Sequence, residues 1–356
     1  MSKARQLAQK PTQPTGRKNL IINGAMNVAQ RSDEVTGITS GSGTTAYRTV
    51  DRIRFEPGSL GTWTVSQETD APAGFSNSFK VLCTVADASP SANDYLLLAH
   101  TKLEAQNLGH LEFGTSGAKD LTLSFWVKSN KTGNASVNLL NAGTTRTTHP
   151  QYTINAADTW EYKTITVSGD TAQSLSGGLE VLFWGNSGST FTGGSHRTTF
   201  GTRVNADRNV SNLGVGGAIN DYWQITGLQL EAGSVATEFE HRSFGEELAL
   251  CQRYFRTSKA SAAYNYILPA MSVESSNTGH VAYDYRGMRT SPTVTSSGGI
   301  QGENAGGTLT FTGAALVGSN FMRVSFSLGT ASTGGTVTHI RDSGSGNAKF
   351  EFNSEL

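Results

Sequence analysis

Residues 121–128 read Leu-Thr-Leu-Ser-Phe-Trp-Val-Lys, and apolar and polar side chains alternate along them. Leu123 and Phe125 therefore share one face of an extended chain, while Ser124 and Trp126 share the other. A period of two residues with a single apolar face is typical of a half-buried antiparallel β-strand. This run predicts a sheet with one face on a core and the other toward solvent.

The same alternation recurs on both sides of this run, in short segments separated by turns rich in Gly, Asn and Ser. The chain contains 41 Gly among 356 residues, and charged residues make up only 16%, which favours strands and turns over long helices. We therefore expect an all-β chain in which residues 19–241 form an antiparallel jelly-roll sandwich. Further strands are expected at residues 19–24, 50–55, 61–66, 79–85, 137–140, 160–167, 179–184 and 222–230.

One helix is expected after the sandwich, over residues 242–256. Ser243 and Glu246 have the spacing of a capping box, in which each side chain bonds a backbone N–H of the first turn. An apolar helix face then recurs at spacings of four, three and four. That face packs either on its own jelly roll or against two further copies of the chain. Its residues are Phe244, Leu248, Cys251 and Phe255.

The two ends of the chain differ from the sandwich. Residues 257–356 predict a smaller C-terminal β domain with few large apolar side chains, which we expect to bury little alone and to be completed by neighbouring copies. Residues 1–18 are basic, lack acidic side chains and contain Pro11 and Pro14, so they cannot pack a core. They form either a disordered tail or an anchor that orders on docking.

Charge and hydropathy exclude several classes of protein. The 28 basic and 28 acidic residues balance, so no global field directs the chain to nucleic acid or to an anionic membrane. No apolar run reaches 18 residues, so we expect no membrane insertion, and the N-terminus lacks the apolar core of a signal peptide. The two cysteines, Cys83 and Cys251, are expected to be unlinked thiols.

Signatures of catalysis and of metal binding are absent from the sequence. Cysteine and histidine residues do not cluster at zinc spacing, no phosphate-binding Gly loop occurs, and no Gly-x-Ser-x-Gly element is present. A glycan-cleaving enzyme needs two facing carboxylates, for which Glu180 and Glu231 are possible but arbitrary choices. We expect no enzymatic activity, no catalytic residues, no cofactor and no metal site.

Three stretches carry a resemblance to a known group of proteins. Residues 19–31, Asn-Leu-Ile-Ile-Asn-Gly-Ala-Met-Asn-Val-Ala-Gln-Arg, with Thr-Val-Asp-Arg at 49–52, resemble the opening of phage tail-fibre-like and tail-associated proteins. Residues 223–233, Trp-Gln-Ile-Thr-Gly-Leu-Gln-Leu-Glu-Ala-Gly, resemble the last strand of carbohydrate-binding-module jelly rolls joined to such proteins. Residues 242–255, with the motif Glu-Leu-x-x-Cys-Gln-Arg-Tyr at 247–254, resemble the helix that follows the jelly roll in the same group.

The resemblance covers residues 19–256 and implies a location in the virion tail, a homotrimer and a role in host attachment. Residues 1–18 would then dock on other tail or capsid proteins. The resemblance supplies no ligand, because a fold does not fix a function. Jelly rolls of this kind sometimes hold a structural calcium ion, for which Asp51 is a candidate ligand, but one carboxylate is weak support for a site of six to eight oxygens.

Aromatic side chains on polar strand faces are the candidate binding residues, because sugar rings pack their C–H faces on aromatic planes. Trp126 and Trp184 lie opposite the apolar faces of their strands, and Trp160 and Tyr162 share a strand face. In the alternative interpretation a loop or a neighbouring subunit covers the first two, and the other two belong to the core. Trp223 is expected in the core. A trimer interface or a receptor surface is expected for Tyr264, Tyr266, Tyr283 and Tyr285.

We therefore expect a phage tail fibre or receptor-binding protein that attaches to host-surface polysaccharide without catalysis. Linked copies would raise the avidity of weak individual sites. Two alternatives stay open at this point. One is a purely structural virion component, such as a capsid decoration, a head fibre or a tail connector, and the other is a glycan-degrading enzyme.

Overall fold

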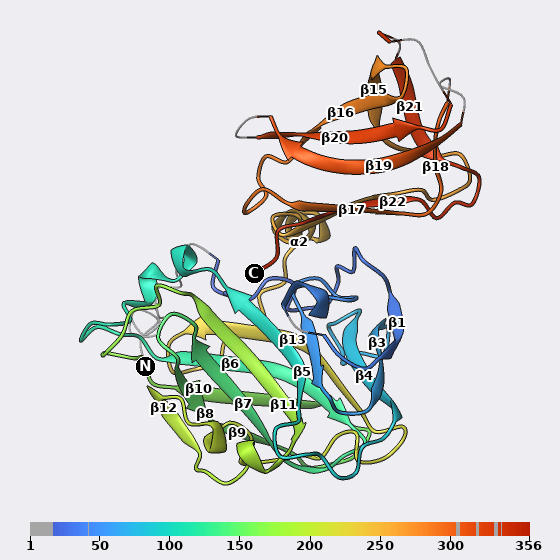
Figure 1. The fold of residues 1–356 in the computed structure, drawn as a ribbon. Coiled ribbons are helices and arrows are strands. Elements are labelled where there is room, and N and C mark those ends of the chain that lie inside the picture. Colours follow the sequence, from blue (N-terminus) through green and yellow to red (C-terminus); the bar gives the residue numbers. More distant parts are fainter. Residues whose placement is uncertain (1–16, 42, 304–306, 318–319, 331–333, 336) are drawn as a thin grey trace. The chain divides into compact units, whose positions relative to one another are not determined.

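The computed structural model describes residues 17–41, 43–303, 307–317, 320–330, 334–335 and 337–356. The chain forms two compact units, Met1–Phe244 and Gly245–Leu356 (Figure 1). The predicted docking segment, residues 1–18, lies outside the described residues except for its last two positions.

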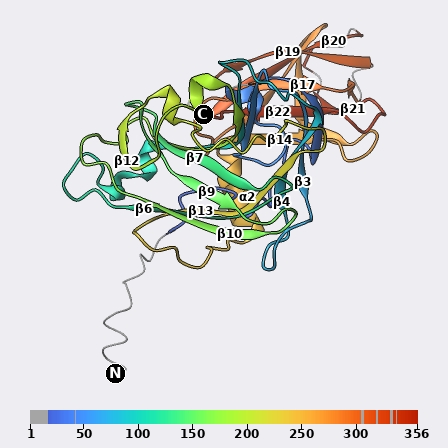
Figure 2. The ribbon, with the colours of Figure 1, turned by 90° about the horizontal axis from the view of Figure 1, so that it is seen from below.

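The first unit is a sandwich of two antiparallel sheets, as the alternating pattern predicts. One sheet has the order β1 (Glu34–Ile38), β3 (Thr62–Glu68), β4 (Ser78–Val85), β13 (Tyr222–Ala232), β6 (Leu121–Ser129) and β10 (Glu161–Val167). The other has the order β12 (Arg197–Thr202), β8 (Arg146–His149), β7 (Gly133–Asn141), β11 (Leu179–Ser187), β5 (Tyr95–Leu103) and β2 (Arg54–Gly58), with β9 (Gln151–Ile154) paired to β7. Figure 2 shows β6, β13 and β10 of the six-stranded sheet.

Five short 3-10 helices lie in the described connections of the sandwich. They are η1 (Gly43–Ala46), η2 (Ala105–Asn107), η3 (Gly109–Leu111), η4 (Ser189–Phe191) and η5 (Asn205–Asp207). Between β11 and β13 the chain passes through η4, the edge strand β12 and η5, and Phe191 of η4 packs on Trp184 of β11.

The core lies between the two sheets and is built from the inward faces that the alternation predicts. Phe125 of β6 meets Phe183 of β11, with ring centroids 5.0 Å apart, and Phe183 meets Trp223 of β13 at 5.5 Å. All three side chains are at most 1% exposed, so they remove nearly all of their apolar surface from water. The predicted core position of Trp223 is confirmed.

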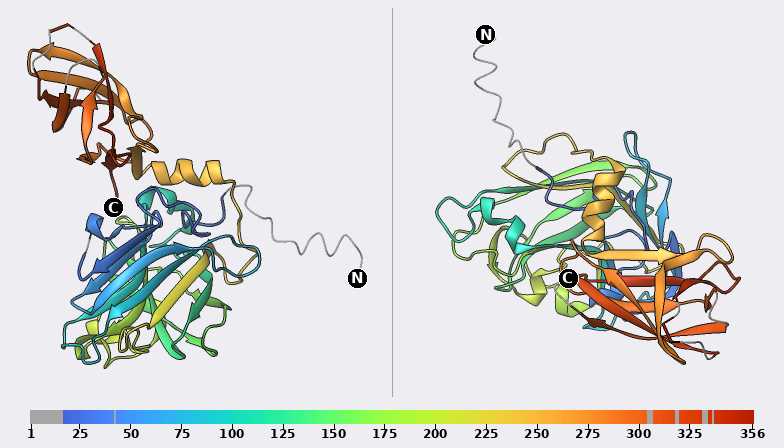
Figure 3. Two further views of the ribbon diagram at one scale, coloured as in Figure 1. Left: turned by 90° about the vertical axis from the view of Figure 1, so that its right-hand side faces the viewer. Right: turned by 90° about the horizontal axis from the view of Figure 1, so that it is seen from above.

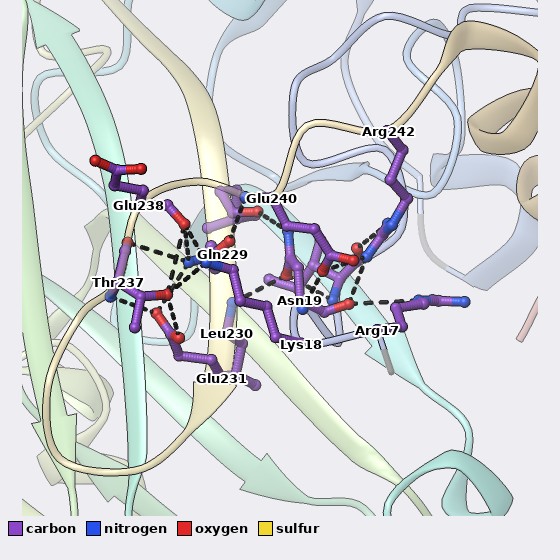
Figure 4. Close-up of polar contacts among 12 residues, drawn as sticks. Arg17, Lys18, Asn19, Gln229, Leu230, Glu231, Thr237, Glu238, Glu240 and Arg242 are labelled. Carbon is purple, nitrogen blue, oxygen red and sulfur yellow. Dashed lines mark hydrogen bonds and ion pairs between the residues drawn. The ribbon is translucent and has the colours of Figure 1, made fainter. Parts of the chain in front are cut away.

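The predicted strand over residues 19–24 is wrong, because these residues adopt turns and irregular backbone. Side chains at the end of the sandwich hold them instead (Figure 4). The Arg242 guanidinium donates to the Asn19 carbonyl at 2.6 Å, and the Asn19 N–H donates to the Glu240 carboxylate at 2.5 Å. The Asn19 side-chain oxygen accepts from the Leu230 N–H at 3.2 Å. The apolar run is therefore anchored by polar contacts rather than by a strand ladder.

The predicted strand over residues 50–55 is right only at its end. Strand β2 begins at Arg54, and Arg52 has a φ of +69°, a left-handed conformation that a strand does not contain. The two cysteines agree with expectation, since Cys83 and Cys251 are both buried thiols.

The second unit opens with the predicted helix, α2 (Phe244–Gln252), shown in Figure 3. It is shorter than predicted because strand β14 (Phe255–Lys259) already begins three residues after its end. Cys251 is fully buried, but Phe244 is 59% exposed and so does not share a buried face with it. Contact between the apolar face of α2 and a neighbouring copy of the chain stays a prediction.

The rest of the second unit is a closed antiparallel barrel with a small sheet. The barrel order is β15 (Tyr266–Ser275), β16 (Thr278–Asp284), β20 (Phe321–Leu328), β19 (Gly307–Leu316), β18 (Ile300–Gly302) and β21 (Val337–Asp342). The sheet joins β14 to β22 (Lys349–Asn353) and β17 (Thr293–Ser297). Phe326, Phe350 and Phe352 are at most 1% exposed, so the unit has a core of its own. The expectation that it buries little alone is therefore wrong, and the homotrimer stays a prediction.

Candidate functional site

Three of the four predicted binding residues come together on the outer face of the six-stranded sheet. Trp126 points outward on β6 because its neighbours Phe125 and Val127 point into the core. Strand β10 pairs with β6 so that Tyr162 lies directly opposite Trp126. Their ring centroids are 5.4 Å apart with an interplanar angle of 48°. Tyr162 is 45% exposed and Trp126 is half-buried, so the pair presents an aromatic surface to solvent.

The third aromatic residue, Trp160, is joined through Asp70 to Lys128, which lies two residues after Trp126 on the same face of β6. Asp70 accepts a hydrogen bond from the Trp160 indole N–H at 3.2 Å and from the Lys128 ammonium at 2.8 Å. Partial burial tends to raise the pKa of Asp70, but these bonds outweigh it and the pKa lies below its ordinary value. The carboxylate is therefore ionised at neutral pH. We call Trp126, Tyr162, Trp160, Asp70 and Lys128 the platform.

Further aromatic rings continue from the platform along the sheet. A Cβ atom added to Gly227 of β13 would lie 2.7 Å from the Phe75 ring and 3.1 Å from Trp126, so both rings lie over this glycine, whose φ is +62°. Phe75 meets Phe239 at a centroid distance of 5.0 Å, and Phe239 meets His241 at 4.9 Å. The predicted binding residues do not include Phe75, Phe239 and His241. These three lie in loops, where side chains do not alternate with a period of two and no outward face can be recognised.

Trp184 is the fourth predicted binding residue, and its prediction is corrected, because its side chain does not lie on this surface. It lies on β11 of the other sheet and is 0% exposed. Phe191 of η4 covers it at a ring distance of 5.4 Å, and the Arg208 guanidinium lies 4.7 Å from its ring centroid. Its indole N–H donates to the Asn138 side chain at 2.7 Å. The alternative interpretation, a residue covered by a loop, is therefore the one observed.

A buried charge network lies on the same sheet as Trp184. His100 contacts Glu56 at 3.0 Å through one ring nitrogen and Glu180 at 2.7 Å through the other. Arg54 pairs with Glu56 and Lys102 pairs with Glu180, both at 2.8 Å. Burial tends to raise the pKa of Glu180, but hydrogen bonds from His100 and Lys102 lower it to about 2. Each carboxylate is paired with a basic side chain or with His100. Because these partners lie on neighbouring strands, the network joins β2, β5 and β11.

The arbitrary carboxylate pair named from the sequence is not a pair. Glu180 lies on β11 of the seven-stranded sheet, whereas Glu231 lies on β13 of the six-stranded sheet and accepts from the Thr237 hydroxyl at 2.7 Å. Asp51 accepts from the Arg31 guanidinium at 3.1 Å, so a basic side chain takes a carboxylate oxygen that a calcium site would use. Across the part of the chain that the structure describes, no group of three or more His, Cys, Asp or Glu side chains is arranged to hold a metal ion.

The four C-terminal tyrosines do not form one surface. Tyr264 and Tyr266 are 55% and 57% exposed, whereas Tyr285 is buried. Tyr283 stacks on Phe352 with ring centroids 3.7 Å apart. Only the first pair is therefore available to a partner, and its role as an interface or receptor surface stays a prediction.

One pocket of about 210 Å³ lies at an end of the sandwich, away from these residues. Its lining consists of Ala105, Leu108, Gly109, Phe113, Ser174, Leu175 and Ser176. These side chains carry no charge, so the pocket offers no chemistry beyond apolar contact and two hydroxyl groups. In the described ranges, no helix is long and apolar enough to cross a membrane.

No family model matches the sequence, and no curated protein matches it. Among solved structures, the chain is similar to the enzymatically active domain of tailspike protein 4 of bacteriophage CBA120, with a TM-score of 0.31 and 13% identity over 60% of this chain and 21% of that one. This chain therefore spans about a fifth of the length of that tailspike chain.

Two carbohydrate-binding modules are also similar. The CBM22-2 xylan-binding domain of Xyn10C from Paenibacillus barcinonensis has a TM-score of 0.28 and 14% identity over 51% of this chain and 91% of that one. The family 11 module of the cellulase Lic26A-Cel5E of Clostridium thermocellum has a TM-score of 0.27 and 10% identity over 56% and 99%. The similarity concerns the all-β sandwich alone, and the fold assignment rests on the strand order given above.

Proposed function

We propose that this protein is a non-enzymatic adhesin of a phage tail fibre, which attaches to host-surface glycans through the platform. The observation that carries the proposal is the contact of Trp126 with Tyr162 on an open sheet face, beside the ionised carboxylate of Asp70. The tail location and the homotrimer rest on the resemblance of residues 19–31, 223–233 and 242–255 to tail-fibre-like proteins.

The platform has the two kinds of group that a sugar requires. Aromatic faces accept the C–H groups of a pyranose ring, and fixed polar groups bond its hydroxyls. Trp126 and Tyr162 supply the first kind, while Asp70 and Lys128 supply an acceptor and a donor. Because Asp70 is already held by Lys128 and Trp160, little side-chain entropy is lost when a ligand binds.

Attachment would gain from several copies of the platform. A shallow surface that contacts one or two sugar units binds weakly, and linking copies raises the effective concentration of the next site. The trimer would therefore bind a repeating polysaccharide far more tightly than one chain binds a short oligosaccharide.

The test is binding of the purified protein, with its mass determined alongside, to host cells and to their extracted surface polysaccharide. We expect saturable binding without release of reducing ends, and about a tenfold weaker affinity for Tyr162→Ala and for Trp126→Ala, the loss typical of one aromatic contact. Tyr162→Ala is the cleaner variant because its side chain is 45% exposed, so its removal leaves the core intact.

Phe321→Ala is the matched control, since it removes an aromatic ring of similar exposure, 43%, from the other unit. Equal loss of polysaccharide binding in the control and in Tyr162→Ala would exclude the platform as the site. If the protein is stable but binds neither cells nor polysaccharide, a structural virion component is the better account. Release of reducing ends would instead support the glycan-degrading alternative.

A further inference from the structure

The outer face of the seven-stranded sheet carries a second aromatic cluster, separate from the main core. Trp184 of β11, Phe191 of η4 and Tyr95 of β5 contact one another, with ring centroids 5.4 to 6.3 Å apart. Arg208, just after η5, lies over two of these rings, with its guanidinium carbon 4.7 Å from the Trp184 centroid and 5.5 Å from that of Phe191. A cation over two aromatic faces is held in place without an ion pair.

Arg208 is half-buried, yet none of the described carboxylates lies within ion-pair distance of it. Glu56 is used by Arg54 and Glu180 by Lys102. The neighbouring Asp207 accepts from the Ser195 N–H at 3.0 Å. Burial lowers the pKa of Arg208 to about 10, but the group stays charged at neutral pH. A partly desolvated cation without an ion-pair partner is unfavourable, so this position favours the binding of an anion.

The guanidinium carbon of Arg208 lies over the rings of Trp184 and Phe191, and the N–H donors of a guanidinium form a planar fork. A planar carboxylate matches this fork with two parallel hydrogen bonds, which a compact ammonium cannot provide.

Two side chains that adjoin the cluster each have a buried polar atom without a hydrogen-bond partner among the described residues. Asn138, which accepts from Trp184, has no partner for its side-chain N–H₂ among the described residues. Asn209, which follows Arg208 and bonds the Phe191 carbonyl through its backbone N–H, has none for its side-chain oxygen. Buried polar groups are normally satisfied, and exceptions call for water, an ion or a ligand.

We propose that Arg208 is the centre of a second binding site on the sandwich, which takes the carboxylate of an acidic sugar such as a uronate. Recognition of the carboxylate rests on Arg208 and the aromatic cluster alone, whereas its being carried by a sugar rests on the proposed function. The site lies on the sheet opposite the platform, so a branched or acidic polysaccharide would have two different points of contact on each chain.

The test measures binding of three probes by calorimetry: a galacturonate trimer, a neutral galactose trimer and inorganic phosphate. We expect the uronate alone to bind, and Arg208→Gln to weaken it by about tenfold to a hundredfold, as for loss of charge-assisted hydrogen bonds. Arg208→Lys keeps the charge but loses the fork, so it should also weaken binding. Lys119→Gln is the matched control, because it removes an exposed positive charge from the same unit and should leave binding unchanged.

The outcomes separate this inference from the proposed function. Uronate binding that survives Trp126→Ala and fails in Arg208→Gln supports the second site, whatever happens at the platform. Binding of neutral host glycan with no uronate binding overturns the inference and leaves the proposed function standing. Uronate binding that Arg208→Gln and Lys119→Gln weaken equally, or phosphate binding of equal strength, also overturns it, since either result means attraction by net charge alone.

Discussion

His149 should make the sandwich unstable in mild acid. It lies on β8, is 0% exposed, and has one ring nitrogen 3.2 Å from the Arg197 guanidinium. Its other ring nitrogen, Nδ1, has no hydrogen-bond partner among the described residues. Burial, and then the charge of Arg197, lower its pKa from the ordinary 6.5 to about 4. The folded protein therefore keeps this imidazole neutral at pH 5, where the unfolded chain would protonate it.

The direction and size of the effect follow from proton linkage. Because the folded pKa lies below the unfolded one, the unfolded state binds more protons between pH 6.5 and 4, so the free energy of unfolding falls as the pH falls through that window. With these two pKa values, His149 lowers the free energy of unfolding by about 2 kcal/mol between pH 7 and pH 5, and by roughly 3 kcal/mol when the window is fully crossed.

Urea unfolding followed by tryptophan fluorescence measures this change. The five tryptophans all belong to the sandwich unit, so the signal reports that unit and is silent on the barrel. In His149→Gln the amide oxygen can still accept from Arg197, and we expect about 2 kcal/mol less loss of stability between pH 7 and pH 5 than in the wild type. His110→Gln, at an exposed position, should keep the wild-type dependence. An equal dependence in wild type and His149→Gln would refute the reasoning.

Three further variants test the packing around the two sheet faces and the barrel. Trp184→Ala should cost about 3–5 kcal/mol of sandwich stability, because it empties a fully buried position, and the urea midpoint measures it. Gly227→Ala should destabilise by at least about 1 kcal/mol, since the left-handed backbone and the Phe75 ring both oppose a Cβ; an unchanged urea midpoint would contradict this. Asp342→Asn should speed amide exchange at Gly344, Gly346, Asn347 and Ala348, because its carboxylate accepts hydrogen bonds from their backbone N–H groups. The tryptophan signal of the sandwich should stay unchanged.

The strands could be predicted wherever a local period of two determined them. Along β6 the inward and outward faces follow directly from residues 121–128, because a strand with one face on a core must alternate. The same reasoning failed over residues 19–24, where the apolar composition suggests a strand but Arg242 and Glu240 bind the backbone instead. Those partners lie more than 200 residues away, so no window of local sequence contains them.

The candidate site could be predicted only in part, for the same physical reason. Trp126 and Tyr162 were found because both lie on strands, and the register of β6 with β10 then brings their rings together. Asp70 and Phe75 lie in a loop and reach the sheet only because of the strand order, in which β13 separates β4 from β6. Loop side chains follow the topology, and topology depends on pairings between strands that are far apart in sequence.

A covering segment determines whether an outward-pointing tryptophan is exposed, as Trp126 and Trp184 show. Each tryptophan alternates with core residues on a central strand, so their local sequences predict the same outward position. Trp126 stays partly exposed beside Tyr162 and the ring of Phe75, whereas the segment carrying Phe191 and Arg208 covers Trp184. A ligand can therefore contact the first tryptophan directly but can reach the second face only through Arg208. For this reason truncating Trp126 should weaken binding at the platform without unfolding the sandwich, whereas truncating Trp184 should destabilise the sandwich itself.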